Sequence, residues 1–361
     1  MVEWKKLGDS CKTITPPKKL GKELYCSEGL YPIIDQGQKD IVGYTDDVSA
    51  LLPQGKYVLF GDHTRYVKYF EGRFAQGADG LKILKAIDSI LPKYFFYIFE
   101  NTEVPSRGYS RHWSIAKELQ IPVPSLSEQQ RIVSILDTFT DSIDNLKEQI
   151  AQRRKQYEHY RDQLLNLEGK EGVEIVPLKE IVKSYCTGAT PNKGHLEYYE
   201  SGTIPWLRTQ DVKFNEIYEI NSFVTDEAVT KTGVKWIPEN CVIVAISGAT
   251  AGRCAINKIP TTTNQHCLNL EINAKKALYK YVYYCVYNAY LDMVSKKQGV
   301  RGDLNSSIIL ETTIPLPSLR EQQRIVSILD TFEASIQNLE AQLKEREKQY
   351  EYYRNKLLTF E

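Results

Sequence analysis

The 361-residue sequence predicts an α+β protein: two globular domains, separated and joined by two long helices that pack as an antiparallel intrachain coiled coil about a pseudo-twofold axis. The first reason is a duplication, because residues 121–168 recur without a gap as residues 314–361, with 32 of 48 aligned positions identical. The second is a heptad pattern in both copies. The third is that the remaining two regions are dissimilar and rich in strand-forming residues. One helix type beside two different globular pieces suggests one scaffold that reads two different things.

Length and composition fit this architecture. A chain of 361 residues is long enough for two domains with helical connectors, and 42% hydrophobic residues is usual for a globular protein. Without an apolar run of about 18 residues or an apolar signal core, we expect no membrane span and a cytoplasmic location. The seven cysteines and five histidines show no metal-ligand spacing, so no metal site is expected.

We expect four segments along the chain: a first domain (1–120), a central repeat helix (121–170), a second domain (171–313) and a C-terminal repeat helix (314–361). Both repeats begin with a proline, a serine and, three residues after the serine, a glutamate. This spacing predicts a capping box at Ser125 and Glu128, and again at Ser318 and Glu321.

Hydrophobic residues alternate at steps of four and three through both repeats, which indicates a coiled-coil seam. The seam positions are Ile132, Leu136, Phe139, Ile143, Leu146, Ile325, Leu329, Phe332, Ile336 and Leu339. Each helix could pair with the other, pack on its own domain, or bind another protein. The seam is interrupted at Arg153 and Arg346, which either fix the register or extend their charged heads into solvent.

The regions before the repeats favour mixed domains. Lys56–Phe60 and Cys241–Ile246 are β-branched and aromatic runs bounded by turn residues, which predict strands. Leu91–Phe99 and Leu278–Ser295 have the apolar spacing of helices. Both domains are therefore expected to combine strands with helices.

The repeated block P-x-P-S-L-x-E-Q-Q-R-I-V-x-I-L-D resembles the central and C-terminal repeats of the DNA specificity subunit of type I restriction-modification systems. The second globular region is similar to that family's target-recognition domains in four ordered segments, namely Gly188–Pro191, Ile204–Val212, Ile246–Arg253 and Asn264–Gln265. The first region follows the plan more loosely, through Tyr31–Gly37, Val58–Asp62 and Ala75–Gly77.

The resemblance implies that each target-recognition domain reads one half of a bipartite site on double-stranded DNA. The helices would set the spacer and dock two adenine-N6 methyltransferase subunits, and a restriction subunit that translocates DNA can join. The chain itself would be non-catalytic and bind no cofactor, since S-adenosylmethionine would be held by the methyltransferase. The seam spans about 50–55 Å at about 1.5 Å per residue, which matches about 15 base pairs.

Base reading needs paired donors and acceptors, such as arginine for guanine and glutamine for adenine. The candidates are Arg208, Thr209, Gln210, Ser247 and Thr250 in the second region, and Gln36, Gln38, His63, Arg65 and Gln76 in the first. Three structural alternatives stay open: a salt bridge at a strand end for residues 208–211, a tight turn for residues 247–253, and solvated loops in the first region.

Phosphate contacts are expected from basic, glycine-containing stretches that precede each repeat. The candidates in these stretches are Arg107, Arg111, Lys296, Lys297 and Arg301. Arg253, at the end of the 247–253 segment, is a further phosphate candidate. The alternative for these stretches is a charged loop in water.

The formal net charge is zero, whereas a protein that binds DNA alone usually carries an excess of lysine and arginine. Partner subunits would then complete a basic clamp around the DNA. The neutral charge equally favours a second class, a structural coiled-coil adaptor or decoy that reads no DNA. An enzyme acting alone is not expected, because the sequence lacks an amino-methyltransferase Asp/Asn-Pro-Pro-aromatic motif and a phosphate loop ending in GK[ST].

Overall fold

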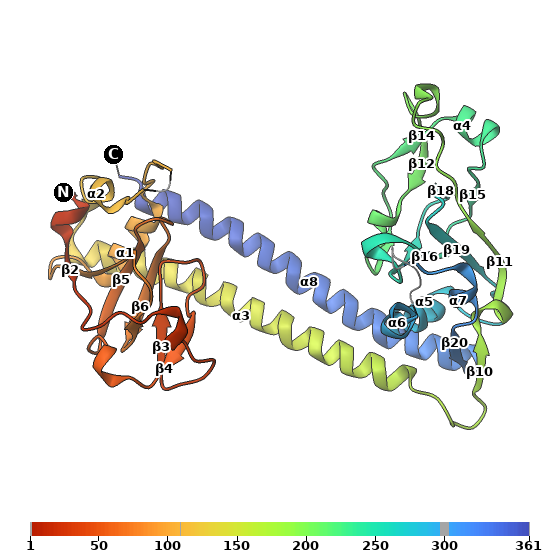
Figure 1. Ribbon diagram of the computed structural model, residues 1–361, viewed down its shortest axis with the longest axis horizontal. Helices are drawn as coiled ribbons and strands as arrows, with labels where there is room; N and C mark the ends of the chain where they lie inside the picture. The colour runs from red at the N-terminus through yellow and green to blue at the C-terminus, as the bar shows by residue number, and fades with distance from the viewer. Residues whose placement is uncertain (1, 109, 297–302, 361) are drawn as a thin grey trace. The chain divides into compact units, whose positions relative to one another are not determined.

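The computed structural model describes residues 2–108, 110–296 and 303–360, and the chain divides into two compact units (Figure 1). Unit 1 contains Met1–Glu148 and Glu340–Glu361, and unit 2 contains Gln149–Leu339. The two long helices, α3 (Leu126–Leu165) and α8 (Leu319–Leu358), each contribute to both units. Each unit therefore holds one globular domain, the start of one long helix and the end of the other.

Unit 1 is built from three small sheets, β2-β8-β5-β6, β4-β3-β7 and β1-β9. Its strands are β1 (Glu3–Lys6), β2 (Cys11–Ile14), β3 (Tyr31–Ile34), β4 (Gly43–Thr45), β5 (Gly55–Gly61), β6 (Val67–Gly72), β7 (Ala75–Gln76), β8 (Leu81–Ala86) and β9 (Gln120–Val123). Its short helices are α1 (Pro92–Asn101) and α2 (Trp113–Ala116).

Unit 2 is built from the sheets β11-β19-β16-β17-β13, β14-β12-β18-β15 and β10-β20. Its strands are β10 (Glu174–Pro177), β11 (Val182–Thr187), β12 (Ile204–Leu207), β13 (Asn215–Ile217), β14 (Phe223–Val224), β15 (Trp236–Ile237), β16 (Val242–Ala245), β17 (Cys254–Asn257), β18 (Thr261–Thr263), β19 (Cys267–Ile272) and β20 (Thr313–Leu316). Its short helices are α4 (Asp226–Lys231), α5 (Tyr279–Asn288), α6 (Tyr290–Ser295) and α7 (Ser306–Leu310).

The two globular domains share one plan despite their dissimilar sequences. In unit 1, β3 pairs in parallel with β7, and β5 and β6 form an antiparallel hairpin. In unit 2, β12 pairs in parallel with β18, and β16 and β17 form the hairpin. Each domain also ends on a strand that pairs with its own first strand, β9 with β1 and β20 with β10. The loose sequence likeness of the first region therefore conceals a shared strand arrangement, to which unit 2 adds β13 and β15.

Helices α1 and α5 bury their apolar faces against the main sheets. The α1 sequence PKYFFYIFEN places Tyr94, Phe95, Ile98 and Phe99 on one face by the three- and four-residue spacing of a helix, and all four are buried. Pro92 opens the helix, where its missing N–H costs nothing. This face also packs with the first turns of α3 in one continuous core.

The predicted helix caps form only in part. The backbone N–H of Glu128 donates to Ser125 Oγ at 3.4 Å, and that of Glu321 donates to Ser318 Oγ at 3.4 Å. Among the described contacts, however, the Glu128 carboxylate does not reach back to the cap but pairs forward with Arg131 at 2.6 Å. The reciprocal half of the capping box is thus replaced by an ion pair one turn into the helix.

The intrachain pairing of the helices is confirmed in each unit. In unit 1, Phe139 near the start of α3 stacks on Tyr353 near the end of α8, with ring centroids 5.3 Å apart. In unit 2, Phe332 near the start of α8 stacks on Tyr160 near the end of α3, also at 5.3 Å. The start of each helix therefore lies antiparallel to the end of the other.

The two seam arginines lie over aromatic rings. The Arg346 guanidinium is 5.7 Å from the Phe139 ring centroid, and the Arg153 guanidinium is 5.9 Å from that of Phe332. Each phenylalanine is thus contacted by both an arginine and a tyrosine of the other helix. Such cation–π contacts favour the register-fixing interpretation of these arginines over a head group that only reaches solvent.

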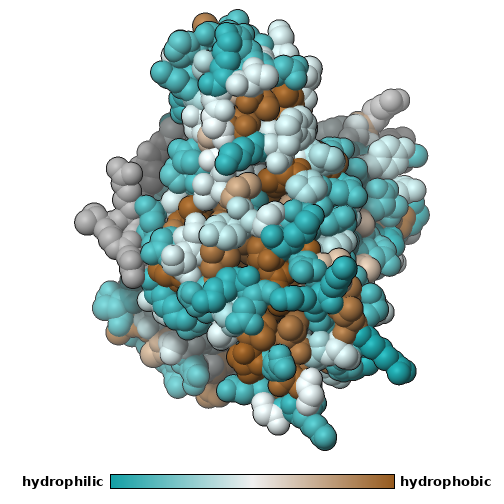
Figure 2. Space-filling view, turned by 90° about the vertical axis from the view of Figure 1, so that its right-hand side faces the viewer, coloured by the Kyte–Doolittle hydropathy of each residue, from teal (hydrophilic) through white to brown (hydrophobic). Residues whose placement is uncertain are grey.

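Hydrophilic side chains cover much of the face drawn in Figure 2, with hydrophobic areas between them. Exposed large apolar side chains of unit 2 include Ile175, Tyr185, Phe223 and Trp236. Within the described ranges, no helix combines the length and hydrophobicity needed to cross a bilayer.

Candidate nucleic-acid interface

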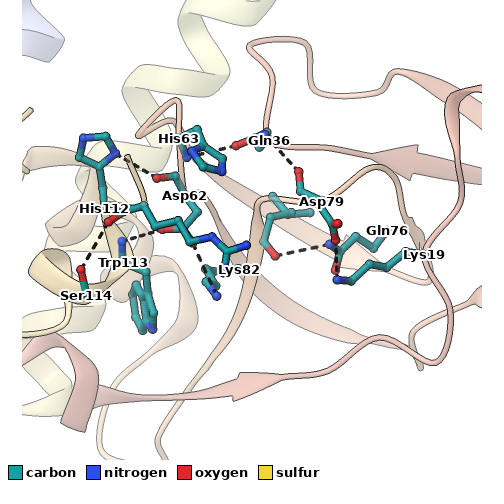
Figure 3. A network of polar contacts seen from close by, with 12 residues as sticks. Lys19, Gln36, Asp62, His63, Gln76, Asp79, Lys82, His112, Trp113 and Ser114 are labelled. Atoms are coloured by element: carbon teal, nitrogen blue, oxygen red, sulfur yellow. Dashed lines mark hydrogen bonds and ion pairs between the residues drawn. The ribbon is translucent and has the colours of Figure 1, made fainter. Parts of the chain in front are cut away.

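In unit 1, a polar network joins the segment after β3 to the turn between β5 and β6 (Figure 3). Gln36 Oε1 accepts from the backbone N–H of His63 at 3.1 Å, and Gln36 Nε2 donates to the carbonyl of Asp79 at 3.1 Å. The Asp79 carboxylate pairs with Lys19 at 2.6 Å, and this hydrogen bond holds the pKa of Asp79 below its usual value. Two candidates far apart in sequence, Gln36 and His63, are therefore brought together.

A buried aspartate ties the basic loop at residues 104–112 to the same turn. The Asp62 carboxylate accepts from the backbone N–H of Trp113 at 2.7 Å and lies 3.6 Å from Lys82 Nζ. The Asp62 carbonyl lies 3.0 Å from Nδ1 of the buried His112, whose Nε2 is 3.2 Å from the backbone N–H of Arg107. These contacts require the His112 tautomer that donates through Nδ1 and accepts through Nε2. The candidates Arg107 and Arg111 therefore lie beside the candidate turn.

The first-region candidates differ in their access to solvent. Gln38, Arg107 and Arg111 are exposed. Arg65, also exposed, adopts a left-handed φ of 65° and donates from Nη1 to the Val104 carbonyl at 2.9 Å. Gln76 is only 1% exposed, and its amide donates to the Leu81 carbonyl at 3.5 Å. Gln76 thus has the surroundings of a core residue, and the function proposed below does not rely on it.

In unit 2, Arg208 follows β12 and precedes a short 3-10 turn at Thr209–Asp211. Asp211 accepts from the backbone N–H of Arg208 at 2.9 Å. Among the described residues, the contact between the two is this backbone hydrogen bond and no ion pair, and the buried Nε of Arg208 has no hydrogen-bond acceptor. The strand-end salt bridge is therefore not formed there, although a buried N–H without an acceptor is costly. An acceptor supplied by a ligand would satisfy it.

The segment at residues 246–253 is the turn between β16 and β17. Gly248 and Gly252 have φ values of 71° and 91°, which glycine adopts readily, and the Arg253 N–H donates to the Thr250 carbonyl at 2.9 Å. The tight-turn interpretation is confirmed for Ser247 to Arg253. A turn at the end of a hairpin still presents its side chains outward, so this finding leaves their contact with DNA a prediction.

The remaining phosphate candidates come from the stretch of chain between α6 and α7. Lys296 is exposed and pairs with Asp292, one helical turn earlier, at 2.6 Å. Lys297 and Arg301 lie outside the described residues. The phosphate role of this stretch stays a prediction.

Residues 264–266 connect the two candidate segments of unit 2. The Asn264 N–H donates to the Leu207 carbonyl at 3.0 Å, and the Ile246 N–H donates to the His266 carbonyl at 2.9 Å. Gln265 and His266 are exposed between the segments. Sequence reasoning noted Asn264 and Gln265 only as family landmarks, and it missed His266 as a candidate. The available signal was the polar run that directly follows the buried threonines of β18.

The candidates of both units come from equivalent places in the topology. One group follows the strand that is paired in parallel, β3 or β12, and the other lies on the hairpin turn, β5–β6 or β16–β17. Each set offers guanidinium, amide or hydroxyl groups on loops, which suits hydrogen bonding to base edges and phosphates. Each unit therefore carries one candidate reading surface.

Comparisons with known proteins agree with this arrangement. The family described as "Type I restriction modification DNA specificity domain" matches residues 1–153 and 170–347. The chain is 32% identical to the "Type I restriction enzyme EcoR124I/EcoR124II specificity subunit" of Escherichia coli over 385 residues, covering 99% of this chain and 94% of that protein. It is 24% identical to a putative type I specificity subunit of Haemophilus influenzae, covering 99% and 96%.

Solved structures share the fold. The S subunit of a type I restriction-modification system from M. genitalium aligns with a TM-score of 0.67 at 18% identity, covering 100% of this chain and 97% of that one. A chain from a study of complex assembly and conformational transition of the type I system aligns with a TM-score of 0.59 at 16% identity, covering 99% and 96%. With two family matches that cover most of its length and paired helices between two like domains, this chain belongs to the family of type I restriction-modification DNA specificity subunits.

Proposed function

We propose that this chain is a non-catalytic scaffold whose two globular domains each read one half of a bipartite site on double-stranded DNA. The observation that carries the proposal is the equivalence of the two candidate surfaces. Both arise from the same two places in one topology, yet the side chains there differ in kind and order, with Gln36 and His63 in unit 1 and Arg208 and Thr250 in unit 2. One frame with different loops is what reading two different half-sites requires.

The helix starts support two copies of one protein partner. Seven positions of residues 125–139 are exposed, and six of these are identical in the second repeat, the exception being Ser127, which aligns with Arg320. The identical exposed residues are Ser125, Leu126, Gln130, Arg131, Ser134 and Thr138. We name these six, with their equivalents in the second repeat, the helix-start stripe.

The middle of the repeats behaves differently. Residues 141–154 have nine exposed positions, of which only Asn145 and Gln149 are identical in the second repeat. A recent duplication alone would leave both stretches equally similar. Exposed residues are also retained near the helix ends, at Lys155, Gln156, Glu158 and Tyr160, so retention is concentrated at the two ends of each repeat. Retention at the helix-start stripe is explained if the same partner binds both copies, and we assign that role to two adenine-N6 methyltransferase subunits. Those subunits would bind S-adenosylmethionine and supply the cationic contacts that a chain of zero net charge lacks.

The stripe can be tested directly. Thr138→Arg combined with Thr331→Arg adds bulk and charge to both stripes, and we expect loss of the 2:1 complex in sedimentation with the candidate methyltransferase. Asp144→Arg combined with Gln337→Arg makes a similar change at exposed positions outside the stripe and is the control. Equal loss for both pairs would place the docking surface elsewhere.

We further propose that the helices set the unread spacer and that a restriction subunit can join the complex, acting in the cytoplasm where the DNA lies. The decisive experiment is a genome-wide map of N6-methyladenine with and without this gene beside its candidate methyltransferase. Loss of one split motif with a fixed gap is the expected result. An unchanged map would favour the adaptor or decoy that reads no DNA, for which the neutral charge is the supporting observation.

A further inference from the structure

The short helices α1 and α5 dock on the starts of the long helices through equivalent contacts. In unit 1, the Tyr97 hydroxyl of α1 donates to the Asp137 carboxylate at 2.7 Å. In unit 2, the Tyr284 hydroxyl of α5 donates to the Asp330 carboxylate at 2.6 Å. The two units thus use one docking geometry.

One helical turn beyond these contacts, the two junctions differ. Three residues after Tyr97 the chain has Glu100, whereas three residues after Tyr284 it has Tyr287. Three residues after Asp137 it has Thr140, and three after Asp330 it has Glu333. Each junction therefore carries one glutamate, which comes from the short helix in unit 1 and from the long helix in unit 2.

In unit 1, the glutamate faces an arginine from the end of α8. The Glu100 carboxylate lies 3.9 Å from Arg354 Nη1, and the Arg354 guanidinium lies 5.6 Å from the ring centroid of Tyr350. Thr140 donates to the Asp137 carbonyl at 3.0 Å and also lies within hydrogen-bond reach of the Tyr97 hydroxyl. Burial raises the pKa of Glu100, so this junction already holds one carboxylate that is poorly solvated.

In unit 2, the equivalent arginine lies over a ring of the short helix and, among the described contacts, pairs with its own neighbour Asp162 at 2.9 Å, not with a glutamate. The Arg161 guanidinium lies 4.8 Å from the ring centroid of Tyr287, and Glu333 accepts from the Tyr157 hydroxyl at 2.9 Å. Burial raises the pKa of Glu333 as well. The nearby Lys280 is already paired with two other carboxylates, at 3.1 Å and 2.9 Å, so a further carboxylate would find little cationic compensation there.

We propose that these paired positions, Glu100 with Thr140 and Tyr287 with Glu333, form a charge code that assigns each globular domain to its own long helix. If the first domain were seated on the start of α8, Glu100 would lie beside Glu333, and two half-buried carboxylates would repel each other. If the second were seated on the start of α3, Arg354 would lose the glutamate partner that it has in unit 1, which is a smaller cost than the repulsion between two carboxylates. The short helix of each domain and the start of its own long helix thus carry compatible side chains.

A double-mutant cycle in the full-length chain tests the code and needs neither DNA nor a partner. Tyr287→Glu is expected to increase local opening of α5, measured by hydrogen exchange of peptides from residues 279–288. Adding Glu333→Thr, which recreates the pair of unit 1, is expected to reverse this increase by about tenfold, within the range for coupled neighbouring residues. Thr140→Glu, rescued by Glu100→Tyr, is the reciprocal cycle in unit 1.

A neutral control separates charge from lost packing. Tyr287→Gln removes the same ring, including its stack on Phe214 at 4.2 Å, but adds no carboxylate. In the Tyr287→Gln variant, adding Glu333→Thr should leave the hydrogen exchange of the α5 peptides unchanged. Additive effects in the glutamate cycle, or equal rescue of the glutamine variant, would overturn the charge code.

Exchange of whole domains gives an independent readout. A chain with residues 1–120 and 171–313 transposed is expected to have weakly protected α1 and α5 peptides. Adding Thr140→Glu and Glu333→Thr together should restore their protection. An exchanged chain that is fully protected without these two changes would refute the assignment.

Discussion

One glutamine in each repeat connects a globular domain to its long helix, and its loss gives a sharp prediction. Gln129 is completely buried, and its Oε1 accepts from the backbone N–H of Leu91 at 2.8 Å. Its Nε2 donates to the carbonyls of Ser89 at 3.1 Å and Pro124 at 2.9 Å. One side chain thus satisfies the N–H of Leu91, the residue that precedes α1, the buried carbonyl of Pro124 and the carbonyl of the exposed Ser89.

The perturbation is Gln129→Leu, which keeps the volume but removes all three hydrogen bonds. An unsatisfied buried N–H costs about 2 kcal/mol, and the buried Pro124 carbonyl costs about 1 kcal/mol because a carbonyl tolerates incomplete bonding better. The carbonyl of the exposed Ser89 can bond to water instead, so its loss costs little. The expected loss of unfolding free energy is about 3 kcal/mol, and the added apolar surface of leucine reduces this figure. Gln322 makes the equivalent bonds in unit 2, to Leu278, Lys276 and Pro317, so Gln322→Leu should cost a similar amount.

The assay is urea denaturation followed by circular dichroism, with hydrogen exchange of α1 peptides as the local readout. The next residue in the chain supplies the control, because Gln130 is exposed and Gln130→Leu should change the free energy by less than about 0.5 kcal/mol. If Gln129→Leu and Gln130→Leu had equal effects, the buried hydrogen bonds would not be what joins domain to helix.

Three further predictions follow from the helices, the junction and the loops. Inserting one heptad into both long helices adds about 10.5 Å to each and should lengthen the recognised spacer by about 3 base pairs, as methylation mapping would show; altered half-sites with an unchanged spacer would disprove this. Burial raises the pKa of the Glu333 carboxyl above its value in the unfolded chain, so the charged form of Glu333 weakens the fold. The free energy of unfolding should therefore fall as pH rises from the unfolded pKa through the folded pKa. Urea titrations of Glu333→Gln at several pH values should lack this fall. Arg107→Ala with Arg111→Ala should weaken binding to every DNA and reduce its salt dependence, whereas Arg208→Ala should relax preference at one base by about 1–3 kcal/mol; a base-specific effect of the first pair would contradict the phosphate role.

The long helices and their antiparallel pairing could be predicted almost completely from the sequence. A heptad period is a property of neighbouring residues, and it locates a seam without knowledge of the rest of the chain. The repeats also showed that Phe139 and Phe332 occupy equivalent positions. The sequence could not show that each phenylalanine ring is contacted by an arginine and a tyrosine of the other helix. Those contacts depend on the register between segments more than 170 residues apart.

The candidate loops were located by type but not by environment. Gln36 and Gln76 look alike in sequence, yet one bridges two loops and the other is buried in the core. Asp62 and His112 were not singled out at all, although together they join the basic loop to the candidate turn. Loop positions depend on contacts between distant residues, and no local period reveals such contacts.

The sequence by itself therefore determined the duplicated helices, their seam and the family, since periodicity and repetition are written along the chain. Only the tertiary structure showed that the dissimilar domains share one topology, and that Gln129 is buried while its neighbour Gln130 is exposed. The physical reason is that burial and hydrogen-bond partners are set where chain segments meet, and the two glutamines differ only in the face of the helix on which they lie.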